Sequence, residues 1–218
     1  MLSYIILGAV LIVFLIVILI RYGIKRGKQR TADLQQFAVL HGFMFVEKRE
    51  KSAIEELSKT HLFSQGHSKK IKNVLNKEMD AAKVSVFDYR YTTGGGQHQS
   101  TVSQTVVYFS SDKLNLPEFY LRPEHIFHKV GGAFGYKDID FVSFPEFSKR
   151  YFLRGEDEEQ IRAVFYGSVM SFFENNEGLS CEGAGNQLIL YKAHKTIKPD
   201  GLPVFIEKGR ELFRLFKK

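Results

Sequence analysis

The first twenty residues constrain this chain more than any other stretch. Residues 2–20 contain no charged side chain, and the next ten residues contain five cations: Arg21, Lys25, Arg26, Lys28 and Arg30. A bilayer core about 30 Å thick is crossed by roughly 20 helical residues that each advance about 1.5 Å. The sequence therefore predicts a transmembrane anchor over residues 1–22, with the bilayer as the partner of residues 2–20, and a basic juxtamembrane linker over residues 23–31.

The apolar run is better explained as an uncleaved anchor than as a signal peptide. No Lys or Arg precedes it, it is longer than a signal h-region, and Ile18 to Tyr22 offers no small residue for cleavage. Because Lys and Arg near a membrane-spanning end stay in the cytoplasm, we expect the N-terminus outside and the domain in the cytosol, at the inner membrane. The same membrane flank could attract anionic lipid, but the topogenic role is favoured.

The charge balance argues against a nucleic-acid partner. The chain carries 31 basic and 24 acidic residues, for a net charge of +7. Residues 1–30 hold five of the basic residues and none of the acidic ones, which leaves 26 against 24 for the rest of the chain. A nucleic-acid-binding domain usually has a strongly basic face, so no nucleic acid is expected.

Residues 32–218 have the length and the aromatic content, 20 Phe and 10 Tyr in the chain, of one soluble domain. Periodicity and turn signals predict helices over residues 32–40, 52–59, 155–173 and 203–216. They predict strands over residues 43–46, 83–91, 102–109, 119–121, 151–153, 179–182 and 187–191. This order indicates an α+β fold, with a mainly antiparallel sheet and packed helices behind the N-terminal transmembrane helix.

The last predicted helix allows two interpretations. Its apolar residues are Phe205, Leu212, Phe213 and Phe216, and cations flank and oppose them. Such a helix could lie at the bilayer surface or dock on the sheet. We favour docking, since a tethered domain needs no second anchor.

Several segments resemble one family of bacterial proteins. They are Phe87-Asp88-Tyr89-Arg90-Tyr91, Gly94-Gly95-Gly96, Gln104-Thr105-Val106-Val107, Leu116-Pro117-Glu118-Phe119, Asp138-Ile139-Asp140-Phe141 and Pro145-Glu146-Phe147-Ser148, with Tyr151, Leu153, Gly155 and Glu156. The family comprises small single-pass membrane proteins of uncharacterised function, and the similarity covers roughly residues 73–166. The resemblance implies a membrane-anchored bacterial protein. It implies no activity, substrate or site, because the shared positions are fold-like and not catalytic.

The glycines Gly94, Gly95 and Gly96 lie between two predicted strands. A phosphate-binding loop would open a helix and bring a lysine followed by Ser or Thr, and neither feature is present. A hairpin tip that needs positive φ explains the glycines better. Because such a tip is polar and exposed, the three glycines are candidate residues for binding a partner.

Asp138 and Asp140 are the other binding candidates. Paired carboxylates can hold Mg²⁺ or act as acid and base, although alternation along a strand, with Ile139 pointing inward, explains them more simply. His125 and His128 could share a helical face as metal ligands, but the sequence lacks a zinc-hydrolase motif and a cysteine pair. We therefore expect no metal, no cofactor and no catalytic residue.

The leading hypothesis is a membrane-tethered cytosolic domain that acts as a binding or adaptor module for another membrane or envelope protein, without catalysis. The alternative is a small enzyme or ligand-binding module with a site near Asp138 and Asp140, together with His125 and His128. That alternative stays open because sites are often assembled from residues far apart in sequence. A lipid sensor built from the basic flank and the last helix is least favoured.

Overall fold

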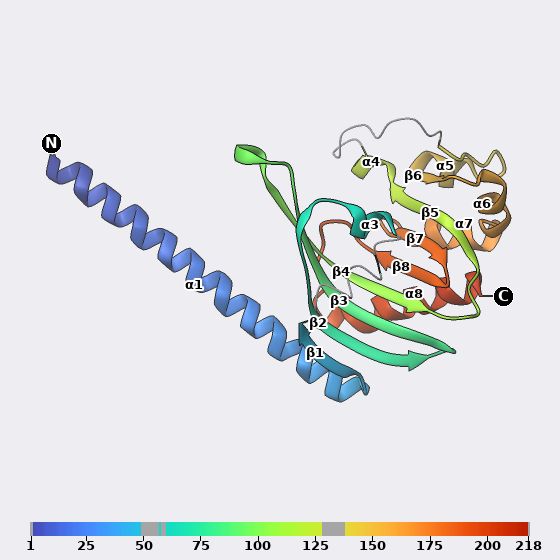
Figure 1. Ribbon diagram of the computed structural model, residues 1–218, viewed down its shortest axis with the longest axis horizontal. Coiled ribbons are helices and arrows are strands. Elements are labelled where there is room, and N and C mark those ends of the chain that lie inside the picture. The colour runs from blue at the N-terminus through green and yellow to red at the C-terminus, as the bar shows by residue number, and fades with distance from the viewer. Residues whose placement is uncertain (1, 49–56, 58–59, 128–137, 218) are drawn as a thin grey trace.

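The computed structural model describes residues 2–48, 57, 60–127 and 138–217. A long helix, α1 (Leu2–His41), projects from a domain built on one eight-stranded antiparallel sheet (Figure 1). The predicted α+β class, with an apolar N-terminal helix and helices packed on a sheet, is confirmed. The strands are β1 (Met44–Lys48), β2 (His67–Met79), β3 (Ala82–Thr93), β4 (Ser100–Ser110), β5 (Leu116–Pro123), β6 (Tyr151–Gly155), β7 (Ser180–Gly185) and β8 (Gln187–Tyr191).

The strands lie in the order β1-β2-β3-β4-β8-β7-β5-β6, and every neighbouring pair is antiparallel. The predicted hairpin of β3 and β4 is confirmed, with pairing from Lys83↔Ser110 to Thr93↔Ser100. The predicted pairing of β7 with β8 is also confirmed. Hairpins keep sequence neighbours adjacent in most of the sheet. The 13-residue strand β2 and its hairpin with β3 were not predicted from the sequence.

Both faces of the sheet are partly covered. The remaining helices are α3 (His61–Ser64), α4 (Glu124–Phe127), α5 (Pro145–Arg150), α6 (Glu158–Val164), α7 (Gly167–Asn175) and α8 (Leu202–Phe216), with short 3₁₀ turns at Gly96–His98 and Pro199–Gly201. Alternation along β3 sends Val84 and Val86 into the larger core, which contains residues of α1, α5, α6, α7 and α8. It sends Phe87 and Tyr89 into a smaller core beneath α3.

The last helix docks on the sheet, as favoured above. Phe205, Leu212, Phe213 and Phe216 of α8 are all buried, and the Phe213 ring stacks on Phe109 of β4 at 5.3 Å between centroids. The opposite, polar side of α8 is held by Arg210, whose Nε donates to Asp80 in the β2–β3 turn at 2.9 Å. The apolar face is therefore used inside the domain.

One predicted helix is divided in the structure. The helix predicted over residues 155–173 is two helices, because the backbone of Tyr166 is extended (φ −83°, ψ 173°) between α6 and α7. Ile161 of α6 and Phe173 of α7 are both buried in the larger core, on either side of the break. The helix predicted over residues 52–59 lies outside the described residues except for Leu57.

Candidate functional site: a polar junction between helix and sheet

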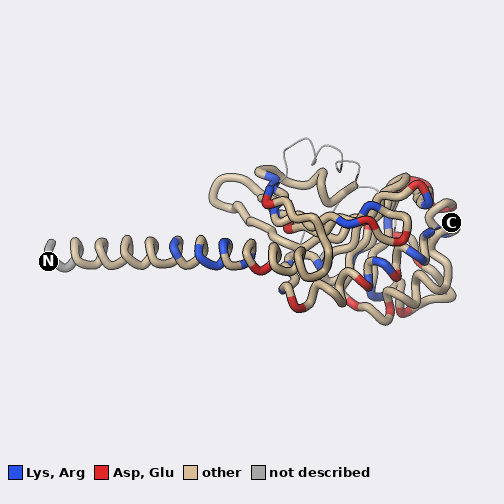
Figure 2. The backbone as a smooth tube through the Cα atoms, turned by 90° about the horizontal axis from the view of Figure 1, so that it is seen from below, with Lys and Arg blue, Asp and Glu red and all other residues tan. Residues whose placement is uncertain are grey.

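Helix α1 runs without interruption through the segment predicted as a linker. Among the described residues, it is the one helix long and apolar enough to cross a bilayer, with a mean hydropathy of 2.7 in its most apolar window. Figure 2 shows that the cations follow the uncharged N-terminal part of the helix and precede the domain. The boundaries of the anchor and the linker stay a prediction.

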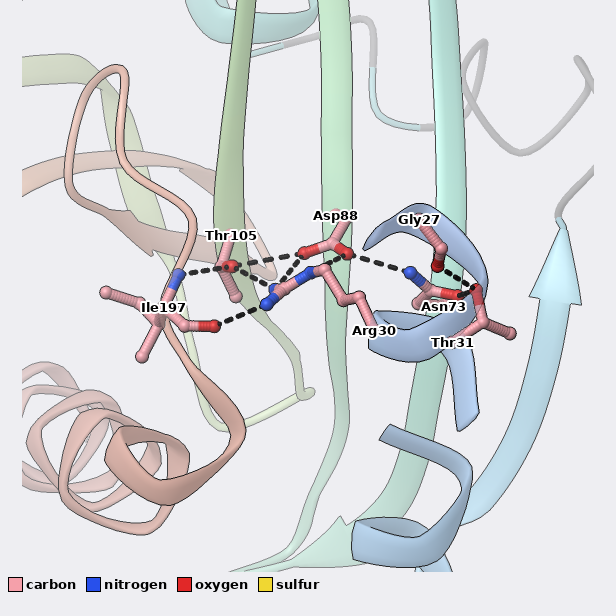
Figure 3. A network of polar contacts seen from close by, with 7 residues as sticks. All are labelled: Gly27, Arg30, Thr31, Asn73, Asp88, Thr105 and Ile197. Carbon is pink, nitrogen blue, oxygen red and sulfur yellow. Dashed lines mark hydrogen bonds and ion pairs between the residues drawn. The ribbon is translucent and has the colours of Figure 1, made fainter. Parts of the chain in front are cut away.

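Arg30 joins this helix to the centre of the sheet (Figure 3). Its Nε donates to Oδ2 of Asp88 at 2.7 Å, and its Nη2 donates to Oδ1 of the same carboxylate at 2.6 Å. Its Nη1 donates to the carbonyl of Ile197 at 2.9 Å. The two charged side chains keep only 22% and 17% of their area exposed. A bidentate, mostly buried pair of this kind fixes both distance and orientation.

Neighbouring polar groups complete the coordination of Asp88. The Asn73 amide donates to Oδ2 at 2.9 Å, and the Thr105 hydroxyl donates to Oδ1 at 3.1 Å. The Thr31 hydroxyl of α1 in turn donates to Asn73 at 2.9 Å. Asn73 reaches this position because it has a positive φ of 53° at an irregularity in the β2–β3 register, a conformation that Asn tolerates well.

After the polar network, the last turns of α1 pack on the sheet through apolar side chains. Leu34, Phe37 and Ala38 of α1 are buried in the larger core. The helix ends at His41, and Gly42 follows with a φ of +67°, a conformation that suits glycine after a helix. The Lys77 ammonium of β2 donates to the carbonyl of His41 at 2.8 Å and so caps the last turn. The last turns of α1 are thus part of the domain, and the helix is continuous from its apolar half to these turns.

The predicted glycine tip is present between β3 and β4. Gly94 and Gly96 have φ values of +75° and +58°, and a Cβ on Gly94 would lie 2.3 Å from the carbonyl oxygen of His98. The His67 ring reaches the carbonyl oxygen of Gly94 at 3.2 Å. Gly94 and Gly96 therefore serve the backbone of the tip, and a role of the three glycines in binding stays a prediction.

Asp138 and Asp140 do not lie on a strand, which corrects the strand alternation expected for these two residues and Ile139. Ile139 is buried and Asp140 exposed as expected, but Oδ1 of Asp138 accepts the backbone N–H of Leu153 at 2.9 Å and does not face water freely. Burial raises the pKa of Asp138 to about 6, and the nearby charges of Asp140 and Glu124 add to this. The carboxyl therefore bonds the backbone of β6, a strand at the edge of the sheet.

The alternative site near these carboxylates receives no support as a metal centre. His125 is exposed in α4, and His128 lies outside the described residues. A shallow hollow beside His125 is lined by Glu124, Arg150 and Tyr151, and neither aspartate contributes to it. In the part of the chain that the structure describes, no three His, Cys, Asp or Glu side chains come together as metal ligands.

A buried carboxyl that the sequence analysis did not single out lies on the face beneath α3. Glu182 of β7 is fully buried; it accepts the Tyr191 hydroxyl and the backbone N–H of Leu62, each at 2.8 Å. Arg122 lies 3.6 Å away, and burial raises the pKa of Glu182. Burial, with help from Arg122, also lowers the pKa of His61 to about 4. The cluster fastens α3 to the sheet. A sequence signal for it exists, namely an acidic residue, Glu182, within a predicted strand.

Comparison with known proteins identifies a shared fold. No family model and no curated protein matches the chain, so the resemblance described above stays a prediction. A solved structure, the mycobacterial trehalose monomycolate transport factor A, TtfA, matches with a TM-score of 0.61 at 11% identity. The match covers 86% of this chain and 96% of that one. At this identity the likeness shows the fold alone.

Proposed function

We propose that this chain is a membrane-tethered adaptor of the bacterial inner membrane, with its domain in the cytosol and no catalytic role. The observation that carries the proposal is the junction of Arg30 with Asp88, at 2.6 Å. About 15 Å of helix separates this pair from the end of the apolar run at Ile20. The domain is therefore held at a set distance and orientation from the bilayer, a geometry suited to presenting a surface to a membrane partner.

Two further observations support the proposal. The five cations at the end of the apolar run lie on the domain side, where the positive-inside rule retains them in the cytoplasm. A protein with the same fold is a transport factor, which is compatible with a non-catalytic role beside a membrane. A topology reporter fused after Lys218 tests the orientation: cytoplasmic activity is expected, and extracytoplasmic activity would contradict it.

The adaptor role is tested by cross-linking the full-length protein in native membranes and identifying captured proteins by mass spectrometry. We expect one reproducible membrane or envelope protein, and weaker capture in the Asp88→Asn variant, in which the domain is released from its fixed orientation. The matched control is Arg162→Gln, which breaks an exposed ion pair with Glu158 of the same 2.6 Å length. Capture at background level, or equal loss in both variants, would contradict the proposal.

A further inference from the structure

The β3–β4 hairpin and α1 leave the junction in the same general direction. Figures 1 and 2 both show the hairpin tip projecting towards the N-terminal part of α1. Ile20 lies ten residues before Arg30, which is about 15 Å of helix. Gly94 lies six residues beyond Asp88, which is about 20 Å of strand. Because Arg30 and Asp88 are bonded, the strand beyond Asp88 is long enough for the tip to reach the level of the end of the apolar run.

The strands on this side of the junction carry cations and no acids. Residues 57–77 and 89–111 contain no Asp or Glu. Lys70 of β2 and Arg90 of β3 are both exposed there. The cytoplasmic leaflet of a membrane carries anionic lipid, so this end of the sheet has the complementary charge. The acids and cations near the opposite end are mixed, as in the Asp80 and Arg210 pair.

Lys70 and Arg90 also form an unfavourable pair. They lie directly opposite each other in the β2–β3 register, and cross-strand partners share a face of the sheet. The partners Lys72 and Asp88 are two residues away along the strands and therefore share that face. Like charges in this arrangement repel each other. The face is the one that carries Asp88 and hence faces α1. An anionic group between the hairpin and the helix would relieve this repulsion.

We propose that the end of the sheet made by His67–Lys70 and Tyr89–Ser103 is a second membrane contact, here called the membrane-facing tip. Lys70 and Arg90 bind the phosphates of anionic lipids, and Gly94–Gly96 lie in the headgroup layer. The layer adds about 5 Å to each side of the hydrocarbon core, which places it at the level of the first cations of α1. The inference rests on the membrane anchor of the proposed function. One spanning helix can turn about its own axis in the bilayer together with the attached domain, and a second contact would fix that rotation.

The depth of the tip is measurable because the chain contains no Trp. We would introduce Gln97→Trp at the tip or Asn115→Trp in the loop that follows the opposite end of β4. Both residues are exposed, and both replacements leave the charge unchanged. The full chain is placed in nanodiscs of phosphatidylcholine and phosphatidylglycerol that contain a headgroup nitroxide. Strong quenching is expected for the Gln97→Trp variant and little for the Asn115→Trp variant. Equal quenching in the two variants would overturn the inference and favour a protein as the partner of the tip.

The charge assignment is tested in the same discs. Each of Lys70→Gln and Arg90→Gln should lower the ratio of membrane-bound to free tips about fivefold. Lys83→Gln, an exposed lysine at the far end of β3, should leave quenching unchanged. Quenching that is the same in discs of phosphatidylcholine alone, or insensitive to both tip variants, would overturn the lipid-phosphate assignment. A chain that fails to co-elute with discs would instead contradict the anchor itself, so the two failures are distinguishable.

Discussion

Breaking the pair between Arg30 and Asp88 should destabilise the domain far more than breaking a surface pair. We propose a double-mutant cycle with Arg30→Gln, Asp88→Asn and the combined variant. The reference is the cycle for Arg162 and Glu158, whose shortest contact has the same 2.6 Å length. The two pairs differ in environment, since 22% and 17% of the side-chain area is exposed in the first and 41% and 55% in the second.

The expected magnitude follows from the hydrogen bonds and the burial. Arg30 donates two charge-assisted bonds to Asp88, and each bond of this class contributes about 1.5–3 kcal/mol when its partner is removed. The two bonds are not additive, and the remaining exposure lets water compensate, so we expect a coupling energy of about 2 kcal/mol. The exposed pair should give at most about 0.5 kcal/mol. Against a total of roughly 5–15 kcal/mol, the junction is a substantial part of the stability.

The assay is urea unfolding of the full-length protein in detergent micelles, followed by near-ultraviolet circular dichroism of the Tyr and Phe side chains. Hydrogen exchange of residues 27–41 adds a local measurement, since release of α1 from the sheet should speed exchange there. A coupling energy for Arg30 and Asp88 no larger than that of the surface pair would refute the rigid attachment. The adaptor proposal would then lose the observation that carries it.

Three further predictions concern the domain itself. Burial raises the pKa of Asp138 from 3.8 to about 6, so the folded state binds the carboxyl proton more tightly than the unfolded state does. The stability that this proton contributes is lost as the pH rises from about 4 to 6. Asp138→Asn should remove this pH dependence of the free energy of unfolding, measured by urea unfolding across that range. Phe213→Ala should lower the free energy of unfolding by about 3–5 kcal/mol because the ring is fully buried against Phe109, whereas Lys217→Ala should leave the urea midpoint unchanged. Cys181 is fully buried with a raised pKa, so it should react with a maleimide only on unfolding; rapid labelling of the native protein would contradict this.

Local patterns predicted most of the architecture. The alternation and the glycines of residues 83–109 indicate a hairpin, and the structure has that hairpin with its predicted tip. The apolar face of residues 203–216 indicates an amphipathic helix, which docks as α8. Over residues 155–173 the apolar periodicity predicted one helix and did not reveal the break at Tyr166, because a helical spacing of apolar residues can continue through two successive helices.

The junction could not be predicted, because its parts are far apart in the sequence. Arg30 and Asp88 are 58 residues apart, and Thr105 and Ile197 come from two further segments. In sequence terms Arg30 is the fifth member of a basic run, and Asp88 is one polar residue in an alternating strand. Nothing local distinguishes this arginine from Lys28, since the distinction arises only when the sheet places a carboxylate beside the helix.

The position of Arg30 at the domain end of the basic run has a mechanical consequence. A flexible linker would let the domain rotate freely beneath the bilayer, and contacts with a membrane partner would then depend on concentration alone. A helix that continues from the anchor into the core, with its arginine bound to the central strands, passes the orientation of the anchor to the sheet. The four cations before Arg30 remain available to the membrane surface, and the fifth fixes the domain beneath it. The basic run therefore has two roles, contact with the membrane surface and attachment of the domain, and its composition alone does not show which cation has which role.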